Sequence, residues 1–471
     1  MPSARSPMLG SCVLAVSVLA MILAACGGGG DPTTTPAVTL TPPPDTSSPT
    51  PVPPSTSYRL VYREYGEKED TIWWALPWDP PEREKLAGIP HREGYGVVAS
   101  ISPDGRMLAY LSLPDSAASD TSSQAEAYVL DLKTKSTRLI TGGVDYTFRP
   151  FWSPDGQLLF MRRLAGPEIL SADVSIIYTK VDREPLEGEL TPTPTPSPTP
   201  VPPDQTPAPS PAPEDPIKTI MKAKYSQVQS FIPIGWADDK RSLFFVQVNG
   251  GLEGVTLVGE YAPATAESIA KEATPTPDPA ATPPPPPDPN APPTPTPTPN
   301  SKFVVQLTDQ TAADYGLSPD LHKVAFSASG LVDGDFVNQA FIADLIAATV
   351  TPIQTDGLPA GDRLRPVWYP DSSRITVGVT PFDGHPGGAV LVPLPKGQPV
   401  FLAEAPSGFD VPLGWAPDGT YLAVTSWSGP DLANRGEPSL DLVAPTGQRW
   451  RVAEGKGYAT ADAAIGWITT S

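Results

Sequence analysis

The stretch FWSPDGQLLF, residues 151–160, predicts a tight turn between two apolar strands. Pro154 presets the backbone of the first turn position, Asp155 tolerates the second position, and Gly156 suits the exit. Apolar residues enter and leave the turn, as expected of a β-hairpin. We therefore assign the aspartate to the turn and not to a metal site.

This pattern recurs about every fifty residues once proline-rich stretches are set aside. Six copies and a final half-copy carry it, at residues 99–110, 150–160, 234–245, 316–326, 367–377, 414–424 and 465–467. The copies at Asp239 and Asp371 lack the full Ser-Pro-Asp-Gly tetrapeptide. Repetition with such a period is typical of propellers and solenoids.

Each copy is followed by a longer apolar segment and then a shorter strand, such as Ala127–Leu132 and Thr137–Thr141. Four strands per unit predict an all-β protein, a β-propeller of four-stranded blades. The chain begins with three strands (Tyr58–Tyr65, Thr71–Trp78, Glu84–Gly88) and ends with the first strand of a blade, Ala463–Thr470. Joined, they make one composite blade and seven blades in all, with six blades as the alternative.

The repeated motif resembles the WD40-like repeats of TolB-type propellers, which centre on Trp-Ser-Pro-Asp-Gly followed by an apolar strand. The resemblance covers nearly all of Tyr58–Ser471. It implies the propeller fold. Because TolB itself resembles a six-bladed propeller, the resemblance also leaves six blades as the alternative to seven. A fold hosts many functions, so it implies function by analogy alone.

The first residues have the features of a secretory signal. Arg5 precedes an apolar run, Met8–Ala25, which ends in Leu23-Ala24-Ala25-Cys26. A cysteine directly after small residues resembles the lipobox of bacterial lipoproteins, in which the cysteine becomes the lipidated first residue of the mature chain. The alternative is an uncleaved membrane-spanning helix. We expect a signal peptide at residues 1–25, lipidation of Cys26, and an extracytoplasmic, membrane-anchored protein of the cell envelope.

Proline accounts for 65 of the 471 residues, and more than half of the prolines fall in three stretches. These are Asp31–Ser57, Thr191–Pro216 and Ala273–Asn300. Their low content of large apolar side chains predicts disorder. The expected organisation is therefore a tether over residues 26–57 and a propeller over 58–471, with disordered insertions at about 191–216 and 273–300.

Charge and cysteine content argue against a nucleic acid partner and against an intramolecular disulfide. The formal net charge is −20 and no cluster of basic residues appears, so we expect no nucleic acid partner. The chain has two cysteines, and Cys12 lies within the signal. Cys26 would then be the single mature cysteine, which leaves no intramolecular disulfide.

The order of strands predicts two unlike faces. The Ser-Pro-Asp-Gly turns and both proline-rich insertions lie on one, the turn face. The other, the open face, is built from the connections between second and third strands and between successive blades. Three aromatic side chains are expected there at the mouth of the channel: Tyr95, Tyr146 and Phe409. They are candidate binding residues for a peptide or glycan, or they cap the core.

Catalytic motifs are missing from the sequence. The three histidines, His91, His322 and His385, are scattered, so we expect no metal site and no cofactor. No Gly-x-Ser-x-Gly elbow appears. We therefore predict that the protein is not an enzyme and acts as a protein-binding or scaffolding module of the envelope. The alternatives are a cell-wall or glycan-binding protein and a metal-dependent propeller hydrolase.

Overall fold

The computed structural model divides the chain into two compact units, Met1–Ser55 and Thr56–Ser471. All described residues belong to the second unit. They are residues 57–76, 82–114, 125–164, 173–181, 217–224, 230–238, 242–249, 255–261, 301–308, 312–332, 335–455 and 464–469. Cys26, the proposed tether and both proline-rich insertions lie outside them.

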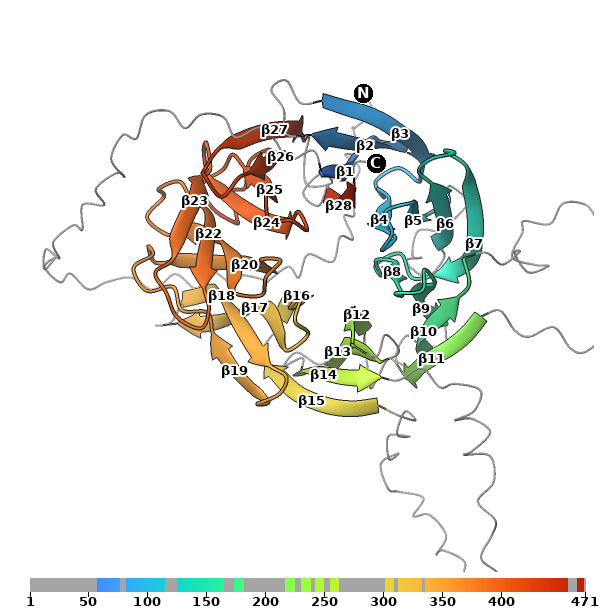
Figure 1. The fold of residues 1–471 in the computed structure, drawn as a ribbon, viewed down its shortest axis with the longest axis horizontal. Helices are drawn as coiled ribbons and strands as arrows, with labels where there is room; N and C mark the ends of the chain where they lie inside the picture. Colours follow the sequence, from blue (N-terminus) through green and yellow to red (C-terminus); the bar gives the residue numbers. More distant parts are fainter. Residues whose placement is uncertain are drawn as a thin grey trace, which may run out of the picture. The chain divides into compact units, whose positions relative to one another are not determined.

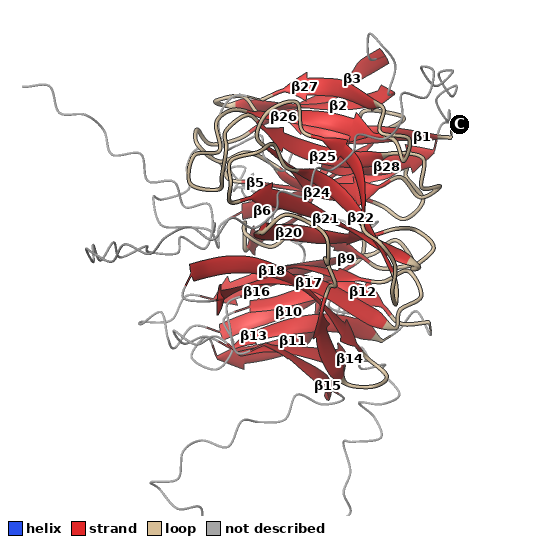
Figure 2. Cartoon of the chain, turned by 90° about the vertical axis from the view of Figure 1, so that its left-hand side faces the viewer, coloured by secondary structure: helices blue, strands red, loops and turns tan. Residues whose placement is uncertain are grey.

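Strands and loops, without a helix, make up the described residues (Figure 2). The strands form seven sheets of four strands each, arranged around a centre (Figure 1). In chain order we call these sheets blades 1 to 7. The described part of the chain contains no apolar helix of membrane-spanning length.

In each blade the four strands follow one another from the innermost to the outermost. Blade 1 comprises β28 (Ala464–Thr469), β1 (Tyr58–Glu64), β2 (Glu69–Leu76) and β3 (Glu82–Pro90). Blade 2 comprises β4 (Val98–Ile101), β5 (Met107–Ser112), β6 (Ala125–Asp131) and β7 (Thr137–Val144). Blade 3 comprises β8 (Phe151–Trp152), β9 (Leu158–Leu164), β10 (Asp173–Thr179) and β11 (Ile217–Lys224). Blade 4 comprises β12 (Ser230–Trp236), β13 (Leu243–Asn249), β14 (Val255–Tyr261) and β15 (Ser301–Thr308).

The remaining three blades have the same order of strands. Blade 5 comprises β16 (Ala312–Leu317), β17 (Lys323–Val332), β18 (Asp335–Asp344) and β19 (Thr349–Pro352). Blade 6 comprises β20 (Gly361–Trp368), β21 (Arg374–Pro381), β22 (Gly388–Pro393) and β23 (Val400–Glu404). Blade 7 comprises β24 (Phe409–Trp415), β25 (Leu422–Trp427), β26 (Pro438–Val443) and β27 (Arg449–Glu454). The prediction of an all-β propeller with four-stranded blades is confirmed.

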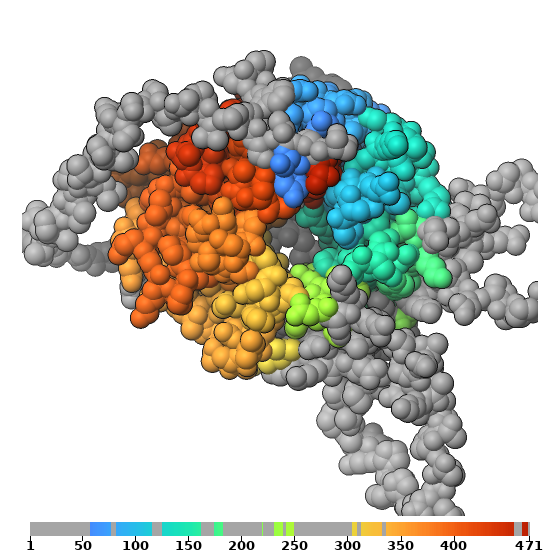
Figure 3. All heavy atoms as spheres, in the orientation of Figure 1, coloured from blue at the N-terminus to red at the C-terminus, as the bar shows by residue number. Residues whose placement is uncertain are grey.

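The ring closes through the composite blade that the sequence predicts. Strand β28 pairs antiparallel with β1, with Thr469 opposite Tyr58 and Trp467 opposite Leu60. Blade 1 in turn packs on blade 7 in an apolar cluster that includes Tyr62 and Leu440. The closed ring is hollowed at its centre in the space-filling view (Figure 3).

The turn of the repeated motif is held by its own serine and aspartate. The Ser102 hydroxyl donates to Asp104 Oδ1 at 2.6 Å and accepts a hydrogen bond from Met107 N at 2.9 Å. Gly105 adopts a φ of 70°, in the left-handed region that glycine enters without strain. Leu321 and Ser372 occupy the same place in two copies without glycine and have φ values of 64° and 61°. The turn geometry is thus kept where the tetrapeptide is incomplete.

Tryptophans of the motif join four of the blades, blades 3, 4, 6 and 7, to the blade before each. The indole Nε1 of Trp236 donates to Trp152 O, and that of Trp368 donates to Gly316 O, both at 2.9 Å. Trp152 donates to Ser100 O at 3.3 Å, and Trp415 to Thr376 Oγ1 at 2.9 Å. These buried donors explain why tryptophan precedes the turn so often in the repeat.

We expect the substitution Trp368→Phe to lower the free energy of unfolding by about 1–2 kcal/mol, because it leaves the Gly316 carbonyl without its indole donor. Urea denaturation measures the change. Trp73→Phe is the matched control, since Trp73 Nε1 has no hydrogen-bond partner among the described residues. Equal losses in the two variants would assign the effect to ring size and not to the hydrogen bond.

The strand directions define the two faces. The turn face carries the Ser-Pro-Asp-Gly turns and the starts of the outermost strands. The open face carries the connections between the second and third strands of a blade and between blades. In blades 6 and 7 these are residues 382–387, 405–408 and 428–437. Residues 65–68, 91–97 and 145–150 complete the described open face around blades 1 to 3.

Candidate functional site

Three large apolar side chains are exposed on the open face of blades 5 and 6. Leu331 and Phe336 are opposite each other in the β17–β18 hairpin and are 65% and 67% exposed. Phe382, directly after β21 in the next blade, is 57% exposed. Exposed apolar side chains that lie side by side, as Leu331 and Phe336 do, are typical of interaction surfaces. We call these three residues the apolar tips.

The turn face offers a natural comparison. Ile346, between β18 and β19, is 74% exposed, and Val400, at the start of β23, is 54% exposed. Both lie in the same two blades as the apolar tips but at the opposite end of their strands. They are therefore suitable positions for controls.

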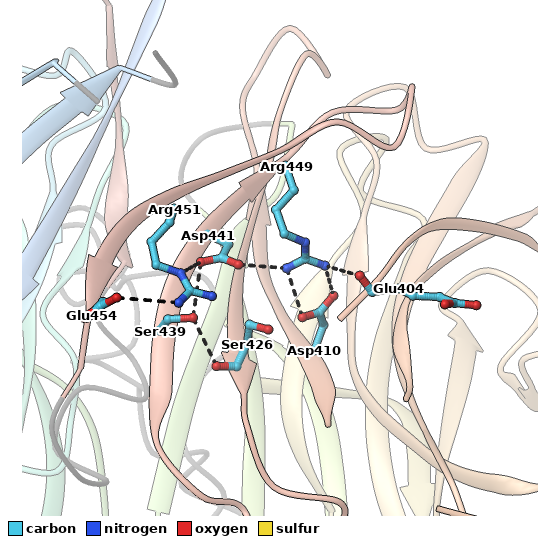
Figure 4. Close-up of polar contacts among 8 residues, drawn as sticks. All are labelled: Glu404, Asp410, Ser426, Ser439, Asp441, Arg449, Arg451 and Glu454. Atoms are coloured by element: carbon cyan, nitrogen blue, oxygen red, sulfur yellow. Dashed lines mark hydrogen bonds and ion pairs between the residues drawn. The ribbon is translucent and has the colours of Figure 1, made fainter. Parts of the chain in front are cut away.

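A buried ion network lies beneath the open face where blades 6 and 7 meet (Figure 4). Asp410 and Asp441 are both completely buried. Arg449 reaches Asp410 Oδ2 at 2.5 Å, Asp441 Oδ2 at 3.0 Å, and the Glu404 carbonyl of blade 6 at 3.1 Å. Arg451 Nε donates to the second oxygen of Asp441 at 3.0 Å. The arginines of β27 are thus fixed by carboxylates of β24 and β26.

Burial and ion pairing shift the pKa values of Asp410 and Arg449 in opposite directions. Burial raises the pKa of Asp410 above its ordinary value, and the hydrogen bonds and charge of Arg449 counteract this only in part. For Arg449, burial lowers the pKa but contacts with Asp410 and Asp441 outweigh it, so the pKa is raised. The guanidinium of Arg449 therefore stays charged and holds the two carboxylates in place.

A pocket of about 270 Å³, lined by both polar and apolar residues, opens beside this network. It is lined by charged residues, serines, prolines, a tryptophan and a glycine: Pro406, Ser407, Ser426, Trp427, Ser428, Glu437, Pro438, Ser439, Arg451, Glu454 and Gly455. The described lining contains no histidine or cysteine, so the residues of a serine–histidine pair are not found together in this pocket. The pocket can offer hydrogen-bond donors and acceptors to a polar group.

The structure brings two of the three predicted aromatic residues together. The rings of Tyr95 and Tyr146 meet edge to face with centroids 5.8 Å apart. The Tyr146 hydroxyl donates to Gly96 O. Both rings are half-buried against the core between blades 2 and 3. They lie on the open face, in the connections β3–β4 and β7–β8.

Phe409 does not belong with these tyrosines. It is completely buried at the start of β24 and stacks on Trp427, with centroids 6.5 Å apart. A ring without exposed surface offers no contact to a ligand, so the burial of Phe409 favours the alternative in which it caps the core. The position of Phe409 in the sequence could not reveal this burial, because Leu364, which packs against it, comes from the neighbouring blade.

Other predicted positions lie outside the described residues. One of them is Cys26, the predicted lipidation site. Among the described residues, no group of three or more histidine, cysteine, aspartate or glutamate side chains is placed to hold a metal ion.

Sequence reasoning missed the apolar tips and the buried ion pairs. The available signal for Leu331 and Phe336 was the Asp-Gly pair at 333–334 in the sequence, because Asp-Gly between apolar residues is typical of a hairpin. The pairing of Asp410 with Arg449 had no such signal, since 39 residues separate them.

No protein-family model matches this sequence, and no curated protein matches it either. Solved structures do match. A prolyl endopeptidase structure is 14% identical with a TM-score of 0.49, covering 84% of this chain and 50% of that chain. An oligogalacturonate lyase from Vibrio parahaemolyticus is 11% identical with a TM-score of 0.47, covering 85% and 86%. The propeller domain of the Trilobed protease from Pyrococcus furiosus is 10% identical with a TM-score of 0.41, covering 84% and 97%.

The protein is a β-propeller protein by the arrangement of its own four-stranded sheets. The chain spans about half the length of the prolyl endopeptidase it matches. The prediction that the chain is not an enzyme is contradicted, because prolyl endopeptidases and acylaminoacyl peptidases are enzymes among its structural neighbours. We withdraw that prediction, while the matches assign no particular reaction to this chain.

Proposed function

We propose that this protein is a lipid-anchored β-propeller of the cell envelope, similar to TolB-type propellers, which binds a protein partner through its open face. The observation that carries the proposal is the exposure of Leu331, Phe336 and Phe382 on that face. Aromatic and aliphatic anchors supply most of the binding energy in protein interfaces. The pocket that Arg451 lines adds hydrogen-bonding groups to the same face.

The lipid anchor and the location rest on the sequence. An apolar run that ends in Leu23-Ala24-Ala25-Cys26 supports lipidation of Cys26. Two or more acyl chains anchor a protein stably, at about 0.8 kcal/mol per buried methylene. Mass spectrometry of the mature N-terminal peptide, compared with a Cys26→Ser variant, tests this part separately.

Site-specific photo-crosslinking tests the open face in cells that produce the full-length chain. A photoreactive phenylalanine analogue at position 382 is expected to form an adduct with a protein partner, and the same analogue at position 346 is not. Replacing Leu331 and Phe336 by serine should lower the adduct at position 382 at least about tenfold, which corresponds to the loss of one strong anchor.

Three results would overturn the proposal. Adducts from position 346 in equal yield would show that the open face is not the binding face. An adduct at 382 that is insensitive to the serine substitutions would remove the apolar tips from the site. Labelling of purified wall polymer in place of a protein would replace the protein partner by a glycan.

A further inference from the structure

A buried histidine–carboxylate pair lies at the base of the β3–β4 connection, residues 91–97. The side chains of His91 and Asp70 are both completely buried. His91 Nε2 lies 3.0 Å from Asp70 Oδ1, and His91 Nδ1 lies 2.8 Å from the Arg92 carbonyl oxygen. Both ring nitrogens therefore face acceptors.

This arrangement is satisfied by the imidazolium form, in which both nitrogens carry a proton. Burial lowers the pKa of His91, but the hydrogen bonds to Asp70 and Arg92 O outweigh it and raise the pKa above its ordinary 6.5. The charged guanidinium of Arg63, 3.6 Å from Asp70 Oδ2, acts against protonation. The Tyr65 ring stacks on the imidazole, with centroids 5.7 Å apart.

Besides Arg63, the titratable side chains around the pair include two tyrosines, which stay neutral, and the exposed Glu67 and Glu93. Burial raises the pKa of Tyr146, whose surroundings include Arg63 and Asp70. Burial likewise raises the pKa of Tyr65, and the charges of Glu67 and Glu93 add to this. His91 is thus the group in this cluster whose charge changes near neutral pH.

The pair holds two connections of the open face together. Asp70 Oδ2 accepts a hydrogen bond from Val97 N at 2.6 Å, and Oδ1 accepts one from Gly66 N at 3.1 Å. Arg63 donates to the Val97 carbonyl. The held segment carries Tyr95 and Gly96, which contact Tyr146 of the β7–β8 connection. Order in residues 91–97 therefore positions the tyrosine pair.

We propose that protonation of His91 is a pH-operated latch that holds residues 91–97, and with them the Tyr95–Tyr146 pair, on the open face. In the neutral imidazole one nitrogen presents a lone pair either to the Asp70 carboxylate or to the Arg92 carbonyl. The unprotonated nitrogen and the oxygen that it faces are then two buried acceptors without a proton between them, which destabilises this arrangement. The segment is held in mildly acidic solution and loosens as the pH rises.

Hydrogen exchange of the full-length protein between pH 5.5 and 8.5 tests the latch. After correction for the intrinsic pH dependence, protection of the peptide covering residues 91–97 should fall by about tenfold or more as His91 loses its proton. Protection of β25 and β26 should stay constant, which separates local loosening from global unfolding. His91→Gln should abolish the pH dependence, whereas His385→Gln, at an exposed pair with Asp383, should leave it unchanged.

A second measurement needs no variant at His91. The chain has three histidines, so histidine-selective labelling gives three imidazole signals, which His322→Gln and His385→Gln assign. The remaining signal, that of His91, should titrate with a pKa above 6.5. Its midpoint should coincide with the pH at which residues 91–97 lose protection from hydrogen exchange. Constant protection in the wild type, or a His91 pKa at or below 6.5, would overturn the latch. Neither result depends on the crosslinking at position 382, so the latch and the proposed partner binding fail separately.

Discussion

Removing residues 464–471 is expected to abolish cooperative folding of the propeller. The deletion takes away β28, the innermost strand of blade 1, and leaves β1 without its inner hydrogen-bonding partner. It also uncovers Leu60 and Tyr62, which are completely buried in the intact ring. We expect a loss of at least about 4 kcal/mol, a large part of the 5–15 kcal/mol that stabilises a typical domain. Circular dichroism during thermal unfolding measures it.

A circular permutant is the control for this deletion. Thr469 and Tyr58 are opposite each other in the β28–β1 pairing, so a short turn between them would make an ordinary hairpin. A chain that begins at Ala464, passes through this turn, and ends at Gly455 should fold as stably as the wild type. A deletion variant that unfolds cooperatively at the wild-type temperature would contradict the role of β28 in closing the ring.

The substitution Asp441→Asn is expected to lower the free energy of unfolding by about 3 kcal/mol. Asp441 is completely buried, and its two oxygens each accept a hydrogen bond from a different arginine, Arg449 or Arg451. Asparagine keeps the shape but removes the charge and turns one acceptor into a donor that faces a guanidinium. Urea denaturation monitored by tryptophan fluorescence provides the measurement.

Asp431→Asn serves as the control for that experiment. Asp431 caps its own loop by accepting hydrogen bonds from Ala433 N and Asn434 N, and it lies in an exposed connection of the same blade. We expect it to change stability by less than about 1 kcal/mol. If Asp441→Asn lowered the free energy of unfolding as little as Asp431→Asn does, the buried network would contribute little to stability. Arg451 would then not depend on Asp441 for its position beside the pocket.

The candidate site shows where sequence reasoning works and where it fails. Tyr95 and Tyr146 were placed on the open face from strand order alone, and the structure has them there in contact. Phe409 was placed there by the same reasoning and is buried, because strand order predicts the end of a strand but not what packs over it. The prediction of a non-enzyme rested on missing motifs, and the enzymes among the structural neighbours contradict it.

Local sequence signals suffice to predict the blade. Pro, Asp and Gly set the turn within four residues, apolar strands flank it, and repetition of the unit predicts a ring closed by Ala463–Thr470. These are local or repeated signals, which a linear pattern contains. The chemistry of the open face depends instead on contacts between distant parts of the chain. His91 meets Asp70 across 21 residues and Arg449 meets Asp410 across 39, since packing between strands and blades brings together partners that no local pattern links.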